Sequence, residues 1–204
     1  MKGRYIALEG IEGSGKSTIA EILAESLSST GLDVSVVREP GATPVGERIR
    51  SVLLDGEAEL GSWTEALLFA ASRAQLARDV IGPALSEGKW IIGDRSIYSS
   101  LAYQGGGRRL GVAEVRSLNE PGLIGVWPDL VALLRVDPET GLGRQKVRDR
   151  IGAEGDKFQS VVAATFDWLA VKEPNRFVVA DALLPVEDVA ALIVREIDRR
   201  WPNP

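Results

Sequence analysis

Residues 10–17 read Gly-Ile-Glu-Gly-Ser-Gly-Lys-Ser, and the expected fold of the chain follows from this stretch. A glycine, four residues, and then glycine, lysine and a hydroxyl residue form a pattern that cradles phosphates, because glycines let backbone N–H groups close around phosphate oxygens. Lys16 can neutralise the outer phosphates, and the Ser17 hydroxyl can ligate Mg²⁺. The predicted nucleotide-binding residues are Gly10, Ile11, Glu12, Gly13, Ser14, Gly15, Lys16, Ser17 and Thr18.

The sequence on either side of this loop gives it the expected context. Residues 4–9 read as a strand, and residues 17–28 read as an amphipathic helix whose apolar face carries Ile19, Ile22, Leu23 and Leu27. An alternative is a glycine-rich turn that only joins a strand to a helix. The order of strand, loop, lysine, hydroxyl and helix favours nucleotide binding over that alternative.

Composition narrows the class of protein. With 204 residues, of which 45% are hydrophobic and 26% charged, we expect a single globular domain over residues 1–204. The net charge of −5 argues against nucleic acid as a partner. The chain has no cysteine and no histidine, which excludes disulfides, thiolate metal sites and imidazole-based catalysis. No leader precedes the first strand and no apolar run could span a bilayer, so we expect a soluble cytoplasmic protein without membrane contact.

Strand-like and helix-like segments alternate along the chain. Strands are predicted at residues 4–9, 33–37, 90–93, 130–136 and 176–179, and helices at 17–28, 45–54, 64–86, 138–150, 156–171 and 186–200. Thr64 is the expected N-cap of the longest helix, with a kink near Gly82-Pro83. This alternation indicates an α/β fold with a parallel sheet covered on both faces, whose ligands bind beyond the carboxyl ends of the strands.

Four further motifs carry a family resemblance. They are Arg38-Glu39-Pro40-Gly41, the Thr-Glu-Ala-Leu-Leu-Phe-Ala-Ala-Ser-Arg of residues 64–73, Asp94-Arg95 leading into the Ser-Ser-Leu-Ala-Tyr-Gln-Gly of residues 99–105, and Pro128-Asp129-Leu130. With the phosphate loop, they resemble bacterial thymidylate kinases, a family of P-loop nucleoside monophosphate kinases, over nearly the whole chain. The resemblance implies a three-layer P-loop kinase fold with a five-stranded parallel sheet and a lid, which is several residues shorter in this chain than in the family pattern. It also implies a homodimer that uses ATP and Mg²⁺ to convert dTMP to dTDP in dTTP biosynthesis.

The resemblance also implies which residues hold the thymine base. Phe69 and Arg73 are four residues apart and share a helix face, where the ring would stack on the base and the guanidinium would donate to a base oxygen. Such stacking contributes about 1 to 3 kcal/mol. Ser100 and Gln104 resemble the remaining base-edge contacts, and Tyr103 resembles the residue that crowds the 2′ position of the sugar. Taken alone, Phe69 would be assigned to the core and Arg73 to the solvated surface, and the neighbouring motifs favour the functional interpretation.

The residues that bind the acceptor phosphate and the metal are predicted from their chemistry and from the family resemblance together. Arg50 and Arg95 are predicted to hold the acceptor monophosphate, since a guanidinium fork suits phosphate oxygens, and Ser99 is placed among the substrate contacts. Asp94 is predicted to hold Mg²⁺ with the loop hydroxyl, although capping of the next helix is an equal alternative. Glu39 resembles the acid near metal and acceptor. A general base is not required, because the second pKa of a phosphate monoester is about 6.

A basic run within residues 143–156 resembles the lid of the family. Arg144 is predicted to contact ATP, and Arg148 and Arg150 are predicted to contact the transferring phosphoryl group; a solvated basic helix end is the alternative. The predicted catalytic residues are Lys16, Glu39, Arg95, Arg148 and Arg150.

The chain departs from the family pattern in three places. Ser96 replaces a tyrosine, Ala42 replaces the second glycine of a Pro-Gly-Gly turn, and Gly152 stands where an acid is common. Two alternatives therefore stay open, namely a kinase for another nucleoside monophosphate and a weakly active or silent nucleotide-binding relative.

Overall fold

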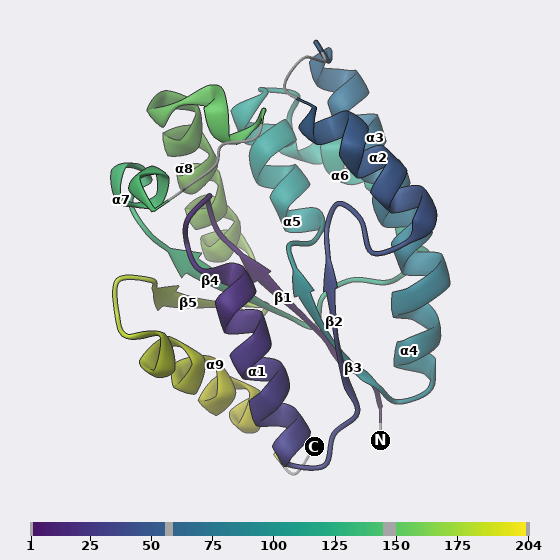
Figure 1. Cartoon of the computed structure of the whole chain (residues 1–204), viewed down its shortest axis with the longest axis vertical. Helices are drawn as coiled ribbons and strands as arrows, with labels where there is room; N and C mark the ends of the chain where they lie inside the picture. The colour runs from purple at the N-terminus through teal and green to yellow at the C-terminus, as the bar shows by residue number, and fades with distance from the viewer. Residues whose placement is uncertain (1, 56–58, 145–149, 203–204) are drawn as a thin grey trace.

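The computed structural model describes residues 2–55, 59–144 and 150–202. Five parallel strands form one sheet in the order β2-β3-β1-β4-β5 (Figure 1). The strands are β1 (Tyr5–Glu9), β2 (Val34–Arg38), β3 (Trp90–Asp94), β4 (Leu130–Arg135) and β5 (Phe177–Asp181). The predicted α/β fold with a five-stranded parallel sheet is confirmed, and each strand lies within two residues of its predicted bounds.

Helices connect successive strands. The α-helices are α1 (Lys16–Ser29), α2 (Pro44–Leu54), α3 (Ser62–Leu76), α4 (Gly82–Ser86), α5 (Ile97–Ser100), α6 (Val112–Leu123), α7 (Pro138–Gly143), α8 (Asp156–Lys172) and α9 (Val186–Arg200). Two π-helical segments, η1 (Ala77–Ile81) and η2 (Leu101–Gly107), and a 3₁₀ turn, η3 (Gly152–Glu154), complete the described elements. Within the described ranges, no helix combines the length and the apolar character that crossing a bilayer requires.

Apolar side chains of the central strands pack into two cores, one on each face of the sheet. Ile6 and Leu8 of β1 pack with the apolar faces of α1 and α9. Tyr5 and Ala7, which alternate with them, pack with residues of α3, α5, α6 and α8. Figure 1 shows α1 and α9 together on one side of the sheet. The three-layer prediction is therefore confirmed.

The predicted helix over residues 64–86 has the wrong N-cap, whereas its helical geometry does change next to Gly82-Pro83, where the sequence predicts a kink. Helix α3 begins at Ser62 with Gly61 as its N-cap, so Thr64 is not the cap. The helix is also interrupted by the π-helical η1 immediately before Gly82-Pro83. Pro83 has no N–H to donate, and a proline ring crowds the carbonyl four residues earlier, which explains why the helix changes its spacing here.

The helix predicted over residues 138–150 is too long. Helix α7 ends at Gly143, and glycine at positions 141 and 143 lowers its helix propensity. Residues 145–149, including Lys146 and Arg148, lie outside the described residues. Helix α6 has no counterpart among the predicted helices, because its internal Pro121 and Gly122 are typical of turns.

Candidate active site

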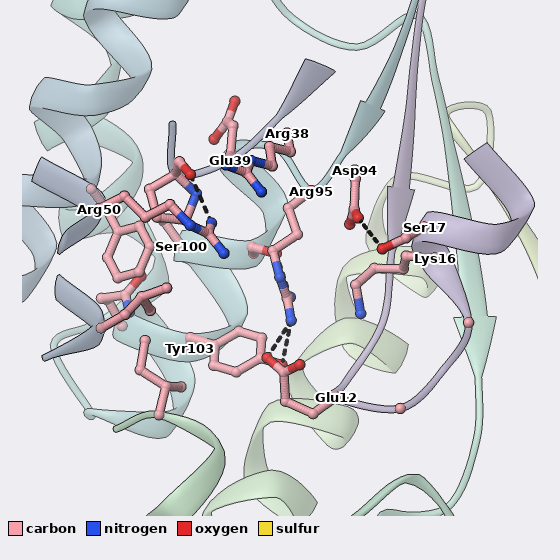
Figure 2. Close-up of a pocket in the computed structure, with 18 of the residues that line it drawn as sticks. Glu12, Lys16, Ser17, Arg38, Glu39, Arg50, Asp94, Arg95, Ser100 and Tyr103 are labelled. Carbon is pink, nitrogen blue, oxygen red and sulfur yellow. Dashed lines mark hydrogen bonds and ion pairs between the residues drawn. The ribbon is translucent and has the colours of Figure 1, made fainter. Parts of the chain in front are cut away.

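A cavity of about 380 Å³ lies beyond the carboxyl ends of β1, β2 and β3 (Figure 2). The register that pairs Leu8 with Asp94, and Arg38 with Asp94, brings these strand ends together. The predicted site residues that line the cavity are Glu12, Gly13, Gly15, Lys16, Ser17, Thr18, Glu39, Arg50, Phe69, Asp94, Arg95, Ser99, Ser100, Tyr103 and Gln104. Four lining residues were not predicted as site residues: Arg38, Pro40, Leu54 and Ile151. The structure therefore gathers most of the predicted site in one place.

Lys16 is held at the N-terminus of α1 by the loop that precedes it. Its Nζ donates to the carbonyl oxygens of Gly10 (3.1 Å) and Ile11 (2.9 Å) and to Ser14 Oγ (3.2 Å). These three predicted residues do not line the cavity, and in this structure they position the lysine that does. Burial, together with the nearby positive charge of Arg95, lowers the pKa of Lys16 to about 8.

Ser17 and Asp94 meet at the edge of the cavity. Ser17 Oγ donates to Asp94 Oδ2 at 2.6 Å (Figure 2). The alternative of Asp94 as a helix cap is wrong, because Ser96 is the N-cap of α5 and accepts from the backbone N–H of Tyr98. A hydroxyl and a carboxylate are oxygen ligands of the kind Mg²⁺ takes beside nucleotide phosphates. No group of three or more acidic, histidine or cysteine ligands occurs in the part of the chain that the structure describes, so a cation here would need oxygens from the nucleotide or from water.

Arg95 points into the cavity from the end of β3 (Figure 2). It has a left-handed backbone, with φ of 75°. Its guanidinium forms an ion pair with Glu12, donates to Ser99 Oγ (3.1 Å) and lies over the Tyr103 ring at 5.1 Å from the centroid. Burial alone would lower the pKa of Arg95, but the charges of Glu12, Tyr103, Glu9 and Asp94 together outweigh burial and raise the pKa, so the cation persists.

Glu9, which was not predicted as a site residue, anchors the segment behind Arg95. This fully buried carboxylate accepts from the backbone N–H groups of Ser96 (2.7 Å) and Ser99 (3.0 Å) and from both of their hydroxyls (2.7 and 2.6 Å). Burial raises the pKa of Glu9. The sequence feature that could have identified Glu9 is its position as the one carboxylate at the end of an otherwise apolar strand. The Ser96 hydroxyl has a defined role here, which gives a physical reason for serine at this departure from the family pattern.

Arg73 lies behind the cavity wall and is not among the lining residues. It is 3% exposed and donates to Glu39 Oε2 (2.7 Å), to Asn119 Oδ1 and to Ser100 Oγ (3.0 Å). The interpretation of Arg73 as a solvated charge is therefore wrong. In this structure it positions Glu39 and Ser100, which do line the cavity, while its contact with a base oxygen stays a prediction. Phe69 is partly buried, packs against the core and lines the cavity.

Two of the three predicted lid arginines contact protein groups outside the cavity. Arg144 Nη1 donates to the carbonyl of Ala182 (3.1 Å). Arg150 Nε donates to the carbonyl of Leu53 (3.0 Å), and its Nη2 lies 2.8 Å from Glu65 Oε2. The third, Arg148, lies outside the described residues.

Known proteins are similar to this chain in both sequence and fold. The thymidylate kinase family model matches residues 8–193. The chain belongs to the thymidylate kinase family. The thymidylate kinase of Caldanaerobacter subterraneus is 40% identical over 97% of this chain and 96% of the relative, and that of Pelotomaculum thermopropionicum is 46% identical over 89% and 87%. The crystal structure of thymidylate kinase from Ehrlichia chaffeensis superimposes with a TM-score of 0.81 at 30% identity, covering 97% of this chain and all of that one. The family membership expected from the sequence is confirmed.

Proposed function

We propose how this chain performs the reaction of its family, the ATP-dependent phosphorylation of dTMP to dTDP. One observation carries the proposal: Lys16 and Ser17 of the phosphate loop line the same cavity as Arg50 and Arg95. A donor phosphate and an acceptor phosphate bound to these two groups would share one enclosed space. Phosphoryl transfer depends mainly on such positioning and on charge neutralisation.

On the donor side, the ammonium of Lys16 and the backbone N–H groups of residues 13–17 would hold the β- and γ-phosphates. Bound Mg²⁺ would be held by Ser17 and Asp94 and would neutralise charge on the phosphate oxygens. Thr18, the residue after Ser17, also lines the cavity.

On the acceptor side, Arg95 exchanges its ion pair with Glu12 for the phosphate of dTMP, and Arg50 holds the same phosphate from α2. The attacking oxygen is already ionised at neutral pH, because the second pKa of a phosphate monoester is about 6. Glu39 therefore acts by fixing Arg73 rather than by removing a proton. Phe69 and Gln104 bind the base, and Tyr103 limits the space at the sugar.

The lid contributes the remaining positive charge in this proposal. Arg144 is assigned to ATP, and Arg148 and Arg150 are assigned to the transferring phosphoryl group, for which Arg150 would exchange its contacts with Glu65 and Leu53. Closure of the lid would exclude water and prevent hydrolysis of ATP.

The deciding experiment measures ADP formation from Mg-ATP with dTMP, dUMP, dCMP, AMP and GMP in separate reactions. We expect dTMP to have the highest kcat/KM. Preference for another acceptor would reject the assigned base pocket, and ATP binding without turnover on any acceptor would reject the catalytic assignment.

Assembly as a homodimer in the cytoplasm, without nucleic acid, completes the proposal. Four large apolar side chains are 46 to 53% exposed on the neighbouring helices α2 and α3: Val45, Val52, Trp63 and Leu67. Val45 and Val52 are two turns apart on one face of α2, and Trp63 and Leu67 are one turn apart on one face of α3. Such a surface is typical of a protein interface.

A further inference from the structure

Glu65 is a buried carboxylate close to the cavity that no step described so far uses. It lies in the first turn of α3, is 1% exposed and is absent from the residues that line the cavity. Its Oε1 accepts from Gln104 Nε2 (2.8 Å) and Arg108 Nε (3.2 Å). Its Oε2 accepts from Arg108 Nη2 (3.0 Å) and lies 2.8 Å from Arg150 Nη2.

These partners keep Glu65 ionised. Burial alone would raise the pKa of this carboxyl, but the hydrogen bonds from Arg108, Gln104 and Arg150 and the charge of Arg108 together outweigh burial and lower the pKa. An ionised carboxylate only accepts hydrogen bonds, so the Gln104 amide must turn its NH₂ group towards it. The amide is then fixed, because the reverse orientation would place two acceptors against each other.

Gln104 itself lines the cavity, from the π-helical η2. Because one Nε2–H donates to Glu65, the orientation of the amide is set, and the carbonyl oxygen Oε1 is directed away from that carboxylate and can accept from a ligand. A glutamine without such a partner can rotate its amide and serve as donor or acceptor. Here the buried charge behind Gln104 holds the amide in the one orientation in which Oε1 faces away from Glu65 and can accept.

We propose that Glu65 is a positioning residue for base specificity, which holds Gln104 so that it offers the base a hydrogen-bond acceptor. The inference rests on the proposed function, in which Gln104 contacts the base of dTMP. The N3 position of thymine carries a hydrogen and donates, whereas N3 of cytosine accepts. The fixed Oε1 therefore matches thymine and opposes cytosine, and leaving a buried polar group unpaired is what makes such discrimination large.

The test compares dTMP with 5-methyl-dCMP, the cytosine analogue that keeps the 5-methyl group. In Glu65→Gln, the side chain at position 65 can accept or donate, so the Gln104 amide is free to flip. We expect the ratio of kcat/KM for dTMP to that for 5-methyl-dCMP to fall about tenfold or more, while KM for ATP is unchanged. Equal losses on both acceptors, with the ratio preserved, would overturn the proposal.

Glu154→Gln is the matched control. It removes the ion pair of Glu154 with Arg108 but leaves the contacts of Glu65 with Arg108 and Gln104 in place. The ratio should stay at the wild-type value. A wild-type enzyme that fails to prefer dTMP over 5-methyl-dCMP would instead reject the proposed base pocket, so the two failures are distinguishable.

If Glu65→Gln does not fold, the wild-type enzyme still tests the proposal. The side-chain amide protons of Gln104, followed by NMR, should be protected from exchange in the free enzyme and remain so with dTMP bound. A crystal structure with dTMP in which Nε2 leaves Glu65 to reach the base would overturn the proposal.

Discussion

At the scale of single residues, the pKa values of the two cations in the cavity depend on burial and on neighbouring charges. Lys16 is buried and Arg95 is partly buried, and the pKa values of these two cations respond differently to their surroundings. Burial and the charge of Arg95 lower the pKa of Lys16 to about 8, while Arg95 remains protonated because guanidinium has a much higher starting pKa and Glu12 supports it. The donor side of the cavity therefore changes charge just above neutral pH.

This difference predicts how ATP affinity depends on pH. Lys16 of the free enzyme loses its proton as pH rises through about 8, and ATP binding must then restore it. The Kd for ATP should be constant at pH values below 8 and increase above it, by at most about tenfold per pH unit. The phosphates titrate near pH 6 and do not contribute in this window. Calorimetric titration from pH 7 to 9.5 measures the effect. In Lys16→Arg, the Kd for ATP should not change over this pH range. A Kd of the wild type that stays constant up to pH 9.5 would reject the buried-lysine explanation.

A second residue-scale prediction concerns the ion pair behind the cavity wall. Arg73 and Glu39 are both almost fully buried and pair at 2.7 Å. Arg73→Ala leaves the carboxylate buried and without this partner, which should reduce the free energy of unfolding by about 3 to 5 kcal/mol. The double variant Arg73→Ala/Glu39→Gln should recover part of that loss, because it also removes the unpaired charge. Urea denaturation measures both. A single variant within about 1 kcal/mol of wild type would contradict the prediction.

At the scale of elements, the phosphate loop packs directly on α7. A Cβ added to Gly13 would lie 1.9 Å from the Gly141 carbonyl oxygen, whereas a Cβ added to Gly15 would meet nothing within 4 Å. Both glycines have positive φ, 73° and 89°. They differ mainly in the space around them, so the pair separates steric contact from backbone strain.

Gly13→Ala should therefore destabilise the fold more than Gly15→Ala. The backbone term of about 1 to 2 kcal/mol applies to both variants, and only Gly13→Ala forces the loop away from α7. Thermal unfolding of the two proteins side by side gives the difference. Equal shifts in Tm would contradict this prediction, because they would mean that α7 can move away from the added methyl group without loss of stability.

The elements also show what could be predicted from the sequence. The five strands were predicted because each is a short apolar run, and the phosphate loop because its residue types have fixed chemical uses. The π-helical η1 and η2 could not be, since periodicity does not distinguish them from α-helix. The positions of Arg73 and Glu65 were also out of reach: each is a charge whose burial depends on partners from other elements, such as Asn119 and Arg108.

At the scale of the whole molecule, the proposed dimer surface and the proposed acceptor site involve the same helices. Helix α2 carries Arg50, and α3 carries Glu65, Phe69 and Arg73. The two helices lie next to each other at one side of the molecule (Figure 1). A partner subunit bound to their exposed apolar faces would hold the acceptor side of the cavity in place.

This arrangement predicts that loss of the dimer weakens dTMP binding. The wild-type chain should sediment as a dimer of twice 21.9 kDa, which is 43.8 kDa. Leu67→Glu places a charge on an exposed residue of α3 and should give a monomer. The KM of this variant for dTMP should be higher than that of the wild type, because the helix that carries Phe69 loses the support of the partner subunit. Val171→Glu is the matched control, because Val171 is 77% exposed on α8, away from this surface. It should remain a dimer with unchanged KM. If the wild-type chain is a monomer, or if Leu67→Glu is still a dimer, the interface through α2 and α3 is rejected. If Leu67→Glu is a monomer with wild-type activity, the interface is kept, but its proposed effect on dTMP binding is rejected.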